Sequence, residues 1–144
     1  MKILICVHSF KNGGAERVAS LWINGFSMRG NHVKVLTCGE EVENDYDIPN
    51  EVEIVNINPG GNFAKRNLAR FFQIRRMLKS YAPDVIILVQ HPWIWWVTFA
   101  KLGLRIPVIN TEHNTFERPE SAPMPKKAYF EKFMLCQTHW LLSL

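Results

Sequence analysis

Near the start of the chain, residues 3–18 carry the stretch ILICVHSFKNGGAERV. Residues 3–7 are continuously apolar, which is typical of a strand buried on both faces of a parallel sheet. The pair Gly13-Gly14 then interrupts the pattern. Apolar residues recur after it at helical spacing, from Ala15 to Phe26. The stretch therefore predicts a strand, a tight glycine turn and a helix, which together make the first unit of an α/β fold.

The rest of the chain repeats this alternation of strands and helices. Further strands are expected at 33–38, 52–57, 85–89 and 106–110, with helices at 65–81 and 92–102 between them. Gly30 is expected to end the first helix and Pro83 to follow the end of the second. Residues 126–136 are expected to be helical, and residues 140–142 to begin a last strand. We predict a single Rossmann-like domain over 1–144, a doubly wound parallel sheet with helices on both faces.

Composition excludes several classes of protein. The chain has 144 residues, of which 47% are hydrophobic, enough for the core of one domain and too many for a disordered chain. A net charge of +4 is too small for a dedicated nucleic-acid binder, so no nucleic-acid partner is expected. The opening apolar run is too short for a secretory signal, and no run approaches the roughly 20 apolar residues of a membrane span. A cytoplasmic chain is expected.

The three cysteines, Cys6, Cys38 and Cys136, are odd in number and form no C-x-x-C pair. We expect buried, reduced thiols.

Three histidines follow expected strands. Ligands of an open parallel sheet bind beyond the carboxyl ends of its strands, and His8, His91 and His113 all fall at that edge, with Glu112 and Asn114 beside His113. A structural role is the simpler interpretation for any one of them, but together they make this edge a candidate site. A zinc site lacks support because no His-x-x-x-His or H-E-x-x-H spacing is present, and no metal is expected. No G-x-S-x-G motif supports Ser-His-Asp chemistry either.

The pair Gly13-Gly14 has two interpretations. Glycine takes positive φ and lets a ligand approach the backbone, and the following helix points unpaired N–H groups at the same edge. A diphosphate would suit that position. The alternative is a plain tight turn, since neither the G-x-G-x-x-G fingerprint nor a P-loop is present.

The helix expected at 65–81 is basic and amphipathic. Its apolar side should hold Leu68, Phe71, Ile74 and Leu78, and its other side carries Lys65, Arg66, Arg70, Arg76 and Lys79. Phe72 and Met77 fall on that cationic side. A basic face with exposed apolar groups is typical of a helix on an anionic membrane surface, here the inner face of the membrane. The alternative is an ordinary solvated face.

The tryptophans Trp93, Trp95 and Trp96 crowd the start of one helix. We expect one or two of them to pack on the sheet. One left at the edge beside His91 would stack on an acceptor sugar or lipid.

Several stretches resemble glycosyltransferase family 4 enzymes of the GT-B fold. They are residues 3–18, the GNHVKV stretch at 30–35, PDVII at 83–87 and IPVINTEHN at 106–114. The resemblance implies an N-terminal domain that holds the acceptor, which is a glycan or a lipid-linked molecule. It also implies that Gly13 and Gly14 lie against the diphosphate of a nucleotide-sugar donor and that His113 is the catalytic residue near the transferred sugar. Retention of anomeric configuration, and no cofactor or metal, are implied as well.

Weaker contacts to acceptor or sugar are expected from five further residues: His8, Glu16, His91, Glu112 and Asn114. The family's C-terminal domain, which binds most of the nucleotide-sugar and carries paired glutamates, is not in this sequence. We therefore expect half of an active site, inactive alone, that needs a C-terminal domain or second subunit as partner. A non-catalytic binding or regulatory module and another Rossmann-like nucleotide binder remain alternatives.

Overall fold

The computed structural model describes residues 1–11, 13–39, 45–59, 62–89 and 92–111. In these ranges the sheet is parallel throughout, with strand order β3-β2-β1-β4-β5. The strands are β1 (Lys2–Cys6), β2 (His32–Thr37), β3 (Glu53–Asn56), β4 (Val85–Val89) and β5 (Val108–Thr111). The helices are α1 (Gly14–Met28), α2 (Phe63–Tyr81) and α3 (Pro92–Ala100). The order reverses between β1 and β4, as in doubly wound Rossmann sheets, and the predicted fold class is confirmed. The elements predicted at 126–136 and 140–142 lie outside the described residues.

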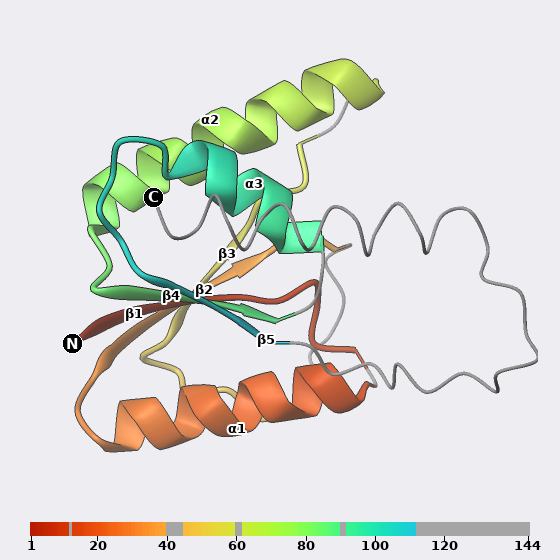
Figure 1. Cartoon of the computed structure of the whole chain (residues 1–144). Coiled ribbons are helices and arrows are strands. Elements are labelled where there is room, and N and C mark those ends of the chain that lie inside the picture. The colour runs from red at the N-terminus through yellow and green to blue at the C-terminus, as the bar shows by residue number, and fades with distance from the viewer. Residues whose placement is uncertain (12, 40–44, 60–61, 90–91, 112–144) are drawn as a thin grey trace, which may run out of the picture.

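Helices cover both faces of the sheet. Figure 1 shows α1 beneath it and α2 with α3 above it. Alternate residues of β1 serve the two layers, because Ile3 and Ile5 belong to the core with α1, whereas Leu4 and Cys6 belong to the core with α2 and α3. A strand that is buried on both faces has no polar side, which explains its continuous apolar run.

The helix ends follow the residues that predicted them. Gly30 has a φ of 74° just after α1, in the left-handed region that favours glycine. The side chain of Asn62 accepts a hydrogen bond from the Lys65 N–H and so caps the start of α2. Ala82 takes a left-handed φ of 48° after α2, immediately before Pro83. α3 ends at Ala100, slightly earlier than expected.

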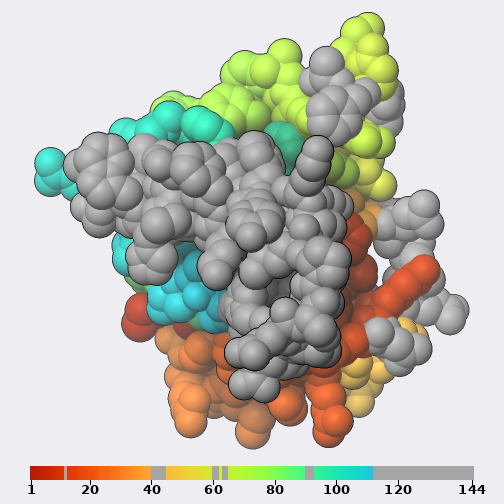
Figure 2. All heavy atoms as spheres, turned by 45° about the vertical axis from the view of Figure 1, so that its right-hand side comes forward, coloured from red at the N-terminus to blue at the C-terminus, as the bar shows by residue number. Residues whose placement is uncertain are grey.

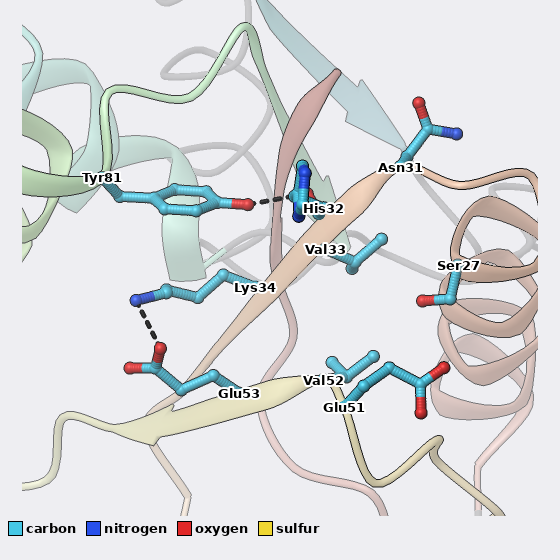
Figure 3. Close-up of a pocket in the computed structure, with 9 residues that line it drawn as sticks. All are labelled: Ser27, Asn31, His32, Val33, Lys34, Glu51, Val52, Glu53 and Tyr81. Carbon is cyan, nitrogen blue, oxygen red and sulfur yellow. Dashed lines mark hydrogen bonds and ion pairs between the residues drawn. The ribbon is translucent and has the colours of Figure 1, made fainter.

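At the amino edge of the sheet, side chains from three elements hold the layers together around a shallow pocket (Figure 3). The Tyr81 hydroxyl donates to the His32 carbonyl at 2.7 Å, which ties the end of α2 to β2. Lys34 pairs with Glu53 at 2.6 Å and lies over the Tyr81 ring. Burial, with Asp84 and Glu53 nearby, raises the pKa of Tyr81. The pocket lies at the edge opposite to the one where such sheets bind ligands, and we assign these contacts to stability.

Candidate functional site

The candidate site is the carboxyl edge of the sheet, where the strands end and all three helices begin (Figure 1). Gly13 precedes α1 here, His8 follows β1, and Cys38 and Gly39 follow β2. The predicted gathering of His8 with the glycine turn at one edge therefore agrees with the structure. His91, Glu112, His113 and Asn114 lie outside the described residues, so their predicted roles stay predictions.

The conformational reason predicted for the glycine pair is wrong. Gly13 has φ −165° and ψ 151°, which is extended backbone that any residue adopts. Space is the constraint instead, because a Cβ on Gly13 would collide with the carboxylate of Glu16. Gly14 is exposed as the first residue of α1, and nothing would contact a Cβ placed there.

Glu16 and Tyr46 both lie against Gly13, one of the two glycines predicted to contact the diphosphate. The Tyr46 hydroxyl donates to the Gly13 carbonyl at 3.0 Å, and the Gly13 N–H donates back to that oxygen at 3.2 Å. Glu16 is 9% exposed in the first turn of α1, where a negative charge favours the helix dipole. Gly13 has no side chain that could cap α1. The exposed backbone at the start of α1 is therefore that of Gly14, while the Glu16 carboxylate lies beside Gly13.

His8 joins the ends of β1 and β2. Its carbonyl accepts hydrogen bonds from the N–H groups of Cys38 at 3.2 Å and Gly39 at 2.8 Å. Its exposed ring lies with Nδ1 3.4 Å from the Cys38 Sγ. A Cβ on Gly39 would sit 2.9 Å from the His8 carbonyl oxygen, so the close approach of the two strands requires a glycine there.

The two described thiols are poor nucleophiles. Burial raises the pKa of Cys38, and the Arg70 guanidinium partly opposes that shift. Burial, reinforced by Cys38, raises the pKa of Cys6 strongly. Both cysteines are free, as expected, although Cys38 is only half-buried. Since the thiolate is the reactive form, neither thiol is suited to covalent chemistry near neutral pH.

On α2, four members of the predicted cationic face, Lys65, Phe72, Arg76 and Lys79, are exposed, and Phe72 is 59% exposed. The prediction that Leu68 faces the core is wrong, since it is also 59% exposed. Together these five residues form one stripe along the helix, named here the α2 stripe. In Figure 2, α2 (yellow-green) and α1 (orange) lie at opposite sides of the molecule, so the outer surface of α2 is directed away from the core.

Two arginines of α2 depart from the predicted cationic face. Arg66 is half-buried, and its Nε has no hydrogen-bond partner among the described residues. Arg70 turns to the carboxyl edge, where its Nε donates to the Ile57 carbonyl at 3.2 Å. Arg70 reaches the strand ends and the Trp96 ring because the sheet and α3 pack beside α2, which helical periodicity alone does not reveal.

The three tryptophans divide as expected. Trp93 is fully buried against the sheet, whereas Trp95 and Trp96 are half-buried. Trp95 stacks on Phe99, with ring centroids 6.1 Å apart, and the Trp96 ring lies 6.0 Å from the Arg70 guanidinium.

Sequence reasoning missed Tyr46, Gly39 and Arg70. Tyr46 and Gly39 belong to no motif in the sequence, and the helical pattern places Arg70 among several other cations of one face. The sequence gives only a weak indication of the role of Gly39: the residue directly follows a strand, where a glycine often marks a close approach of two backbones.

Within the described ranges, no three His, Cys, Asp or Glu side chains come together in a way that could hold a metal ion. No helix in the same ranges is long and apolar enough to cross a bilayer.

The model of Glycosyltransferase Family 4 matches residues 12–141 of the chain. No curated protein matches it. Among solved structures, the apo form of the lipopolysaccharide outer core galactosyltransferase WaaB superposes with a TM-score of 0.64 at 18% identity, over 76% of this chain and 32% of that one. A glycosyltransferase from Rickettsia africae gives 0.61 at 17% identity, over 94% and 34%.

A UDP-GlcNAc 2-epimerase from Neisseria meningitidis gives a TM-score of 0.58 at 14% identity, over 99% of this chain and 38% of that one. An epimerase and transferases thus share this fold, so the likeness in structure identifies the architecture alone. The chain spans about a third of the length of each of these three proteins.

Proposed function

The chain belongs to glycosyltransferase family 4, and from that premise we propose that it forms the acceptor side of an active site. In this proposal a sugar passes from a nucleotide-sugar donor to a glycan or lipid-linked acceptor. The observation that carries it is the carboxyl edge of the sheet, where the start of α1 at Gly13-Gly14 lies at the same edge as the exposed ring of His8. In this proposal sugar transfer requires the whole enzyme, and this chain supplies the acceptor side of its active site.

At the start of α1, the donor diphosphate is the group that the helix would stabilise. Negative charge builds on the leaving phosphate during transfer, and helix N-termini and backbone amides lower the energy of such charge. Gly14 allows close approach because no side chain stands in front of it. Glu16 opposes a second negative charge there, so donor binding requires its carboxylate to turn aside or to bond a sugar hydroxyl.

His113 is proposed to lie near the transferred sugar, with weaker contacts from His91, Glu112 and Asn114. We further propose that transfer proceeds with retention and without a metal or other cofactor. These four residues follow β4 and β5 in the chain, and the carboxyl ends of parallel strands share one edge.

Activity is expected only with a second domain. The purified chain should release no nucleoside diphosphate from UDP- or GDP-sugars and should bind those nucleotides weakly, because most donor contacts would lie in the other half. Transfer should appear when a C-terminal half is co-expressed in trans, with the acceptor present. Appreciable sugar transfer by the chain alone would refute the proposal that activity requires a second domain. Tight nucleotide binding by the chain alone would favour a different Rossmann-like nucleotide binder.

We also propose that the α2 stripe contacts an anionic membrane surface. The protein would then be a cytoplasmic, peripheral membrane protein. The support is the pair Leu68 and Phe72, each 59% exposed, on a helix that has no acidic residue. Each basic residue near such a surface contributes about 1 kcal/mol.

Vesicle binding tests this second proposal. The chain should bind anionic vesicles and not neutral ones, and Arg76→Gln should weaken binding about fivefold. Phe72→Ser should weaken it too, by removing an inserted ring. Arg29→Gln is the control, because it removes one exposed charge at the far end of α1. Equal losses in Arg76→Gln and Arg29→Gln would indicate a nonspecific charge effect and contradict the proposal.

A further inference from the structure

Arg70 stands apart from the other cations of α2 because its guanidinium is held at the carboxyl edge. Its Nε donates to the Ile57 carbonyl at 3.2 Å, and its Nη2 donates to the Asn58 Oδ1 at 3.0 Å. A longer contact of 3.5 Å joins Nη2 to the Cys38 carbonyl. Ile57 and Cys38 directly follow β3 and β2. The charge is therefore fixed just beyond two neighbouring strand ends.

Cys38 connects this guanidinium to His8. Its carbonyl receives the long Arg70 contact, its N–H donates to the His8 carbonyl, and its Sγ lies 3.4 Å from the His8 Nδ1. The ends of β1, β2 and β3 are thus joined in one continuous set of contacts. His8 and Arg70 therefore contact the same residue, Cys38, the first through its sulfur and the second through its carbonyl.

The positive charge of Arg70 is left without a counter-charge in the part of the chain that the structure describes. Lys34 pairs with Glu53 at the opposite edge, and no ion pair of Arg70 is found among the described residues. Among the described residues, the hydrogen bonds of Arg70 come from its Nε and Nη2. Trp96 covers the guanidinium at 6.0 Å from its ring centroid, which limits how the group can turn.

We propose that Arg70 and His8 form a subsite for a phosphate group carried by the acceptor. This rests on the proposed function, and it narrows the acceptor to a phosphorylated sugar or a lipid phosphate. An arginine held by neighbouring carbonyls is preorganised to donate to phosphate oxygens, and charged hydrogen bonds of this kind are stronger than neutral ones. The exposed imidazole adds a donor from the next strand end, and the Asn58 amide lies beside them.

A purely structural Arg70 is the competing interpretation. In that case the guanidinium only satisfies the carbonyls that end β2 and β3. Both interpretations predict that Arg70→Gln lowers stability, so a loss of stability decides nothing. Only the subsite predicts phosphate binding that also depends on His8, whose ring is exposed and whose replacement should leave the fold intact.

The test is an NMR titration of the 144-residue chain with glucose 6-phosphate, glucose and inorganic phosphate. We expect glucose 6-phosphate to shift the His8 ring signals and glucose to leave them unchanged. His8→Gln and Arg70→Lys should each weaken binding, by on the order of tenfold for the arginine. Arg29→Lys, the same substitution at an exposed arginine after the end of α1, is the control and should bind as the wild type does.

A second arm identifies the source of the phosphate. Binding to vesicles of phosphatidic acid is compared with binding to vesicles of phosphatidylcholine, because phosphatidic acid carries the phosphate on a lipid. Arg70→Lys is measured in the Arg76→Gln background, in which the contribution of the α2 stripe is already weakened, so a further loss of binding is due to the subsite. Dependence on Arg70 in either arm supports the subsite and names its source. No phosphate binding by the wild type, or equal binding by wild type, His8→Gln and Arg70→Lys, overturns it. Because binding is measured without transfer, absence of transferase activity in trans would refute the proposed function and leave this result standing.

Discussion

Close neighbours explain why glycine stands at two positions of the candidate site: a side chain at Gly13 and a backbone carbonyl at Gly39. A Cβ on Gly13 would displace the buried carboxylate of Glu16, and a Cβ on Gly39 would press against the backbone carbonyl of His8. Neither position needs a positive φ, since positive φ among the described glycines occurs at Gly30 and Gly103. The glycine pair that suggested a ligand-binding loop therefore contains one residue constrained by packing and one, Gly14, that is free to meet a ligand.

The pair of variants Gly13→Ala and Gly14→Ala separates these roles. Gly13→Ala should destabilise the domain by about 1–2 kcal/mol, because Glu16 must move out of a tightly packed place. Gly14→Ala should leave stability unchanged or raise it by up to about 1 kcal/mol, because alanine favours the helix. Urea unfolding followed by circular dichroism measures both. The packing explanation fails if Gly14→Ala is the more destabilising of the two.

At the level of helices, α2 serves two surfaces with neighbouring arginines. Arg75 donates from Nη1 to the carbonyls of Ala100 at 2.8 Å and Leu102 at 2.9 Å, so it satisfies the end of α3. Arg76, the next residue, is exposed on the α2 stripe. Both are arginines on the same helix, and only the packing of α3 beside α2 distinguishes them.

Replacing each arginine by methionine tests that distinction. Arg75→Met should cost about 1–3 kcal/mol, because two hydrogen bonds from a charged group to carbonyls are lost at a helix end. Arg76→Met should change stability by no more than about 0.5 kcal/mol. Thermal and urea unfolding of the two variants give the comparison. Similar losses in both would mean that the Arg75 contacts contribute little.

For the molecule as a whole, buried thiols make stability depend on pH. The pKa of Cys6 is raised in the folded state, so above an unfolded-state pKa of about 8.5 the unfolded chain releases a proton that the folded chain keeps. The folded state then binds more protons than the unfolded one, and stability must fall as pH rises. Cys38 and Tyr81, whose pKa values are also raised, act in the same direction.

Unfolding free energies between pH 7 and pH 10, in the presence of reductant, provide the measurement. Cys6 should contribute a slope of about 1.4 kcal/mol per pH unit once the unfolded thiol has ionised. Cys6→Ala will be less stable at every pH because of the cavity, but its decline should be shallower than that of the wild type. Curves that stay parallel would show that Cys6 does not drive the effect.

The local pattern of residues was enough to predict the described helices and strands, their succession along the chain and the parallel sheet that they form. Apolar periodicity and the breaks at Gly30 and Pro83 depend on neighbours in the chain, so they are readable without the fold. Only the tertiary structure decided which of several similar residues are exposed and which contact other elements. Leu68 is exposed because none of the described elements packs over it. Arg70 is held at the strand ends by carbonyls that are distant in the chain. Glu16 lies against Gly13 because the first turn of α1 brings the two together. Helical periodicity assigns a side chain to a face, but what covers that face is decided by the packing of other elements against it.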